Sequence, residues 1–209
     1  MKKGLWIGIL LMAFATGLVP TLDHMVLANG FGGDISDTWF LVNGNMESRG
    51  TCWDPAEVTR MKQGMKFYIH LTDNGDGSYM SEAYSLSASP DGKCWQLQGI
   101  TGDTDELPLY GGIEVFPSAD GQDAFFVFFG HGISYQDTTP GVWTPVEHNQ
   151  AVWGTVKLLK EATNKIRMEL RLLLQFDNGS GSCVQMGQFK GMKADPPTSI
   201  CSMPAFLKK

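Results

Sequence analysis

Residues 165–176 alternate between polar and apolar side chains. Every even position is apolar, and most odd positions carry a charge or an amide. A period of two residues is typical of a β-strand with one buried and one solvated face. A helix is the alternative, because Lys, Glu, Met, Arg and Leu favour helices, but it would place Met168, Leu172 and Phe176 on its solvent side. The pattern therefore predicts a strand whose buried face holds Ile166, Met168, Leu170, Leu172, Leu174 and Phe176.

A second strand, up to Met192, is expected to run back along the first after a glycine-rich reversal over residues 178–182. Other short apolar runs recur between turns rich in Gly, Pro, Asn and Asp, for example residues 65–71 before the turn 73–78. The run 124–129 is apolar on both faces and predicts a central strand. The chain should therefore be all-β, an antiparallel meander of about nine strands that closes as an up-and-down barrel, with a β-sandwich as the alternative.

The N-terminus has the features of a secretory signal peptide. Lys2 and Lys3 precede an apolar run that ends near Val19, and Pro20 and the segment Val26-Leu27-Ala28 follow, with the small residue Ala28 at the expected cleavage position. We expect residues 1–28 to be removed, residues 29–193 to form one β domain, and the proline-rich tail 194–209 to be tied to it. A retained membrane anchor is the alternative, although the apolar run falls short of the usual ~20 residues. The mature protein should then be periplasmic or secreted, without a stable membrane span.

All four cysteines follow the predicted cleavage site. An even number of cysteines in an exported chain predicts two disulfides. We favour the pairs Cys52 with Cys94 and Cys183 with Cys201, while the other two pairings stay open. The spacings match neither a redox motif nor a zinc site, so a metal or redox role is not expected.

Charge and motifs exclude several classes of function. The formal net charge of −6 makes nucleic acid an unfavourable partner. The sequence has no recognisable catalytic, phosphate-binding or dinucleotide-binding motif, so no catalytic residue, metal ligand or cofactor is predicted. His70, His131 and His148 lie on separate predicted elements and are expected to be surface or hydrogen-bonded residues. Residues 54–57 predict one helical turn, with Pro55 at its first position, in a loop that either covers a site or is only a surface loop.

Residues 35–192 resemble the lipocalin or calycin type of secreted barrel. The resemblance rests on export, on the early segment Ile-Ser-Asp-Thr-Trp that ends at Trp39, and on the meander behind it. The family's opening motif is Gly-x-Trp, and Asp37 stands here at the glycine position. The family also packs a late-strand arginine on this tryptophan, a role for which Arg167 and Arg171 are candidates. The resemblance implies a barrel that binds a small apolar ligand.

Aromatic residues are the candidates for such a site, because ligand pockets are commonly apolar with a few polar groups. Glu82 would be a polar anchor for a ligand if it faces inward, and a solvated charge if it faces outward. We favour the outward orientation. The same rings can instead fill the barrel solidly, and the sequence favours a filled core over a cavity. Two functions follow: an exported binding protein for a small apolar or aromatic ligand, or a cell-envelope interaction protein without a cavity; a hydrolase comes third. The candidate ligand-binding residues are Trp39, Tyr68, Glu82, Tyr84, Trp95, Phe128 and Trp153.

Overall fold

The computed structural model describes residues 35–53, 55–89, 92–102, 111–139, 142–159, 165–177 and 182–201. The predicted signal peptide lies outside the described residues, as do most of the predicted reversal at 178–182 and part of the tail. The described elements are β1 (Thr38–Gly50), α1 (Pro55–Gln63), β2 (Met65–Asp73), β3 (Tyr79–Ser89), β4 (Gly92–Thr101), β5 (Glu114–Pro117), β6 (Asp123–Thr139), β7 (Val142–Leu158), β8 (Ile166–Asp177) and β9 (Ser182–Ala194).

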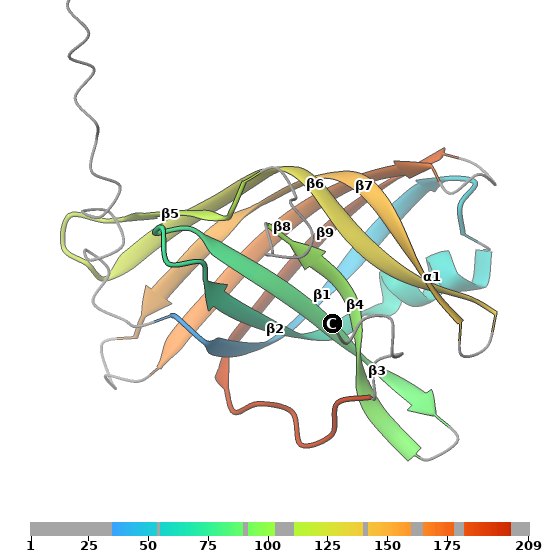
Figure 1. The fold of residues 1–209 in the computed structure, drawn as a ribbon, viewed down its shortest axis with the longest axis horizontal. Coiled ribbons are helices and arrows are strands. Elements are labelled where there is room, and N and C mark those ends of the chain that lie inside the picture. Colours follow the sequence, from blue (N-terminus) through green and yellow to red (C-terminus); the bar gives the residue numbers. More distant parts are fainter. Residues whose placement is uncertain are drawn as a thin grey trace, which may run out of the picture.

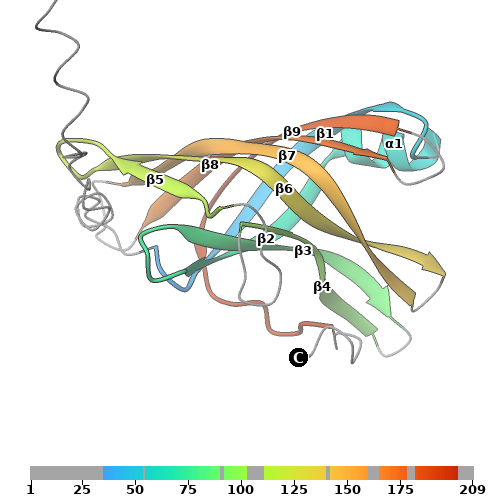
Figure 2. The same cartoon turned by 45° about the horizontal axis from the view of Figure 1, so that its top comes forward.

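The strands form a closed antiparallel barrel. Chain neighbours pair in hairpin order from β1 to β4 and from β5 to β9, β9 pairs with β1, and β4 pairs with β6 (Figures 1 and 2). Eight strands therefore complete the ring, and β5 is an additional strand on the edge of β6. The closure between β4 and β6 is short, with three residue pairs from Gly99 opposite Ser134 to Thr101 opposite Gly132. The predicted all-β, up-and-down barrel is thus confirmed, and the fold is not a sandwich.

The alternation of polar and apolar residues over 165–176 corresponds to alternating exposed and buried side chains in β8. In β8, Ile166, Met168 and Leu170 are buried, whereas Arg167 and Glu169 between them are exposed. β9 pairs with β8 along its length and alternates in the same way. Each strand therefore contributes one face to the barrel interior, as the alternation predicted.

Apolar side chains fill the interior at the end where β1, β6 and β8 begin. Phe40, Val42 and Val156 are fully buried there, and Phe126 and Phe128 of β6 join the same cluster. The apolar run 124–129 lies between β5 and β7, so the predicted central strand is confirmed. Its outward residues are not covered, since Phe125 is 44% and Phe129 71% exposed.

The predicted disulfide pairing is wrong. The bonds join Cys52 to Cys183 and Cys94 to Cys201. Chain spacing is misleading here because β9 returns to lie beside β1, which places Gly50 opposite Cys183.

The second disulfide attaches the chain after β9 to β4. Ile200 forms a parallel bridge with Trp95 of β4, and Trp95 exchanges two backbone hydrogen bonds of 2.8 Å with Ser199 and Cys201. All four cysteines are paired, and such bonds fit an oxidising, exported environment. Within the part of the chain described, no helix has the length and apolar character needed to cross a membrane.

Candidate ligand-binding cavity

A cavity of about 600 Å³ occupies the other part of the barrel interior, towards α1. All eight barrel strands, the helix and Trp53 contribute to its wall. The interior is therefore neither empty nor solidly filled: it is packed at one end and open at the other. The expectation of a filled core is therefore correct only for the packed end, where β1, β6 and β8 begin.

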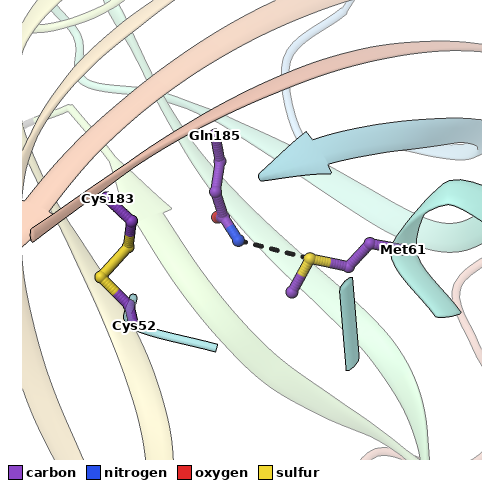
Figure 3. The surroundings of a disulfide bond; sticks show 4 residues. All are labelled: Cys52, Met61, Cys183 and Gln185. Atoms are coloured by element: carbon purple, nitrogen blue, oxygen red, sulfur yellow. Dashed lines mark hydrogen bonds between the residues drawn. A yellow bond between two sulfur atoms is a disulfide. The ribbon is translucent and has the colours of Figure 1, made fainter. Parts of the chain in front are cut away.

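The helix α1 forms the wall where β1 ends and β2 begins. Pro55 starts the helix, as predicted, but the helix has nine residues and not one turn. Asp54, the first residue of the predicted turn, lies outside the described residues. Met61 is buried at 3% exposure and points to Gln185 of β9, whose Nε2 donates a hydrogen bond of 3.4 Å to Met61 Sδ (Figure 3).

A disulfide holds the approach to this helix. Cys52 precedes α1 by three positions and is bonded to Cys183 at the start of β9, close to the contact between Met61 and Gln185 (Figure 3). After α1, Gly64 leads into β2 with a positive φ of 129°, a conformation that favours glycine. The disulfide before α1 and the turn at Gly64 after it therefore hold the helix beside the cavity.

The cavity has an apolar side on four adjacent strands, β8, β9, β1 and β2. The side chains there come mainly from the inward positions of the alternating strands, including Met65, Phe67 and Ile69 of β2. The apolar ones are Val42, Met46, Met65, Phe67, Ile69, Leu170, Leu172, Leu174 and Phe189, and the buried Gln185 of β9 is the polar residue among them.

The opposite side, on β3, β4, β6 and β7, carries many uncharged polar groups. His148 and Gln150 are buried at 5% and 7% exposure. His148 Nε2 lies 2.9 Å from Gln150 Oε1, and Gln150 Nε2 donates a hydrogen bond to the Thr101 hydroxyl. The polar residues on this side are Ser85, Gln96, Gln98, Thr101, Ser134, His148 and Gln150.

This hydrogen-bonded chain spans the short closure of the barrel. It starts on β7, passes over β6 at Gly132, and ends on β4. A Cβ at Gly132 would lie 2.6 Å from Gln150 Cδ, so the glycine leaves the space that the Gln150 side chain occupies. Gln150 is therefore the group that approaches the backbone closely at Gly132.

Burial keeps the imidazole of His148 neutral. Desolvation lowers the pKa of His148 and outweighs its contacts with Gln150 and the Val146 carbonyl, which act in the opposite direction. A neutral imidazole has one N–H, so the shorter contact, to Gln150 Oε1, is the bond that it donates.

The predicted ligand-binding residues lie elsewhere, and none of them lines this cavity. Trp39 alternates with the buried Phe40, and its neighbour across the strands is His70, so both face outward. Tyr68, Glu82, Tyr84 and Trp95 gather on the same outer face. Phe128 is part of the packed core, and Trp153 lies opposite the exposed Arg171 on the outer face of β7.

The outer group is closely packed. The rings of Trp39 and His70 stack at 4.2 Å, Trp39 and Tyr84 lie 5.4 Å apart, and Tyr68 meets Trp95 edge to face at 4.5 Å. The ring that stacks on Trp39 is thus His70, whereas Arg167 and Arg171, the two candidates for that position, are exposed on β8.

Carboxylates surround His70. Its Nδ1 lies 3.1 Å from Glu82 Oε2 and its Nε2 2.7 Å from Asp37 Oδ1. The hydrogen bond with Glu82, and then that with Asp37, raises the pKa of His70 despite partial burial. Glu82 also accepts a hydrogen bond of 3.0 Å from the Tyr84 hydroxyl, whose pKa is raised by burial and then by the Glu82 charge. Glu82 faces outward as favoured, but it is a bonded charge and not simply a solvated one.

A metal centre is not apparent in the described residues, where no group of three or more His, Cys, Asp and Glu side chains could hold an ion. His70 and His148 lie on opposite faces of the barrel wall. Comparison of the chain with protein-family models, with curated proteins and with solved structures finds no match.

Proposed function

We propose that this protein is an exported binding protein that holds a small, largely apolar ligand inside its barrel. The observation that carries the proposal is the cavity of about 600 Å³ between α1 and the packed core. Ligand sites in proteins typically measure about 300–1,000 Å³ and are apolar with a few placed polar groups. The cavity has that size, and its lining is mainly apolar on one side and rich in polar groups on the other.

Two further observations support a lipocalin-like role. The barrel is closed by strands in the order that the resemblance implies. Asp37, at the position where the family has glycine, adopts a φ of 47°, in the left-handed region that favours glycine and that aspartate tolerates. Export to the periplasm or the medium is part of this proposal, and the two disulfides are consistent with it.

A cavity-filling variant tests the proposal. Val152 lines the cavity, whereas its neighbour Ala151 pairs with the exposed Phe129 on the outer face. Val152→Phe should weaken binding of the fluorescent apolar probe N-phenylnaphthylamine by about tenfold or more, and Ala151→Phe should leave it unchanged. Overpacking costs about 1–3 kcal/mol, so circular dichroism must first show that both variants are folded. Equal binding by the two folded variants, or no binding by the wild type, would refute the proposal.

A second candidate function is an interaction surface on the cell envelope. Phe116 of β5 and Phe125 of β6 are cross-strand neighbours, and with Phe129 they leave apolar rings exposed at 39%, 44% and 71%. Contiguous exposed apolar residues often mark contact sites. Replacing Phe125 and Phe129 with Ser should then abolish association with envelope proteins in a cross-linking experiment, without changing probe binding. Unchanged cross-links would exclude this surface.

A further inference from the structure

The charges around the cavity limit the ligands that it can accept. Among the described residues that line it, Glu57 and Arg60 are the ones with formal charges, and both belong to α1. They bind each other through two hydrogen bonds, with Arg60 Nε 2.9 Å from Glu57 Oε2 and Arg60 Nη2 2.5 Å from Glu57 Oε1. The guanidinium is therefore already paired with a carboxylate. An ionised ligand group entering the barrel would lose water without gaining a counter-ion, which is unfavourable.

The polar side of the cavity offers a different kind of contact. Its hydroxyl, carboxamide and imidazole groups are uncharged, and they lie on β3, β4, β6 and β7, opposite the apolar side. The buried His148 stays neutral for the reason given above. Several uncharged donors and acceptors along one wall suit a ligand with several hydroxyl or carbonyl groups along one side.

Thr101 is the best-defined contact on this wall. Its hydroxyl accepts the hydrogen bond of Gln150, and a hydroxyl that accepts still has its own proton to donate. The chain from His148 through Gln150 fixes the position of Thr101 Oγ1 at the cavity surface. An acceptor oxygen of the ligand would find the Thr101 O–H already placed.

On the basis of the proposed function, we propose that the ligand is an uncharged amphipathic lipid of the acyl-polyol type. Its acyl chain would contact β8, β9, β1 and β2, and its ester and hydroxyl groups would bind the polar wall at Thr101. Ionised fatty acids of the same chain length would be poor ligands.

Competition against bound N-phenylnaphthylamine tests this ligand class. A monoacylglycerol should displace the probe at a concentration about tenfold or more below that of the matching fatty acid at neutral pH, since the carboxylate must enter without a cation. If the fatty acid competes equally well or better, the inference is wrong. The proposed function survives that result, because the probe and both lipids still bind. Failure of the probe to bind the wild type would instead refute the proposed function itself.

A Thr101 variant tests the contact. Thr101→Val keeps the shape of the side chain and removes the hydroxyl, so it should lower the affinity for monoacylglycerol, relative to the affinity for the probe in the same variant, by about fivefold or more. Thr155→Val is the matched control, because Thr155 is exposed on β7 and outside the cavity. Equal lipid affinity in the two variants would overturn the assigned role of Thr101.

Discussion

Shortening Met168 to alanine would measure how tightly the closed end of the barrel is packed. Met168 is 2% exposed and belongs to the main apolar cluster. Replacing a buried Met with Ala costs about 2–5 kcal/mol, from lost burial and the cavity left behind. We expect about 3 kcal/mol, since Met168 lies at the packed end and the neighbouring barrel strands limit collapse around the space. For a chain of this size that corresponds to a melting temperature lower by about 6–12 °C.

Arg167→Ala is the matched control on the same strand. The Arg167 side chain is 47% exposed and lies 3.6 Å from Glu169, itself 53% exposed. Exposed pairs of this kind contribute less than about 1 kcal/mol, so the melting temperature should change little. Urea and thermal unfolding followed by circular dichroism would measure both variants. Similar losses in the two variants, or a helical spectrum of the wild type, would refute the assignment of β8 and its buried face.

Three other predictions concern the constraints on the barrel. Peptide mapping without reduction should recover the bonds between Cys52 and Cys183 and between Cys94 and Cys201. The cysteines are separated by 131 and 107 residues, so each bond stabilises the fold by up to about 5 kcal/mol in the chain-entropy model. Recovery of any other pairing would contradict the topology. Gly132→Ala should displace the Gln150 side chain and cost about 1–3 kcal/mol in urea unfolding, a loss that should nearly vanish when Gln150 is already alanine. The pKa of His70 is raised in the folded protein, so His70 stabilises the fold below about pH 6.5, and this stabilisation is lost as pH rises through its folded-state pKa. The pKa of His148 is lowered in the folded protein, so the stability linked to His148 is present above about pH 6.5 and is lost as pH falls through its folded-state pKa. His70→Gln should remove the loss of unfolding free energy at rising pH, and His148→Gln should remove the loss at falling pH. The opposite result, with each variant removing the other pH dependence, would contradict the environments described for both histidines.

The fold was largely predictable from alternation, because burial on one side of a strand leaves a direct record in the sequence. Residues 165–176 show it for β8, and residues 65–71 show it for β2. The same record could have located the cavity wall. Phe67 and Ile69 occupy inward positions of β2, and Tyr68 between them occupies an outward position. The sequence-based prediction chose residues mainly by aromatic type, and six of the seven, all except Phe128, lie on the outer face.

Other features depend on contacts that alternation does not record. The disulfide pairing follows from β9 lying beside β1 and from the return of residue 200 to Trp95. His148, Gln150 and Thr101 meet because β4 closes onto β6. Polar residues at inward positions of β7 were a detectable signal, since Gln150 alternates with the outward Ala151 and Asn149. Their partner on β4 could not be identified without the register of the closure.

Methionine methyl groups give the most direct test of a ligand inside the barrel. Met46, Met61 and Met65 line the cavity, whereas Met186 is 44% exposed outside it. In protein labelled at the methionine methyls, titration with N-phenylnaphthylamine should move the nuclear magnetic resonance signals of the three cavity residues through the ring current of the bound probe. The Met186 signal should stay in place. Binding that shifts Met186 and leaves the three cavity signals unchanged would contradict the account.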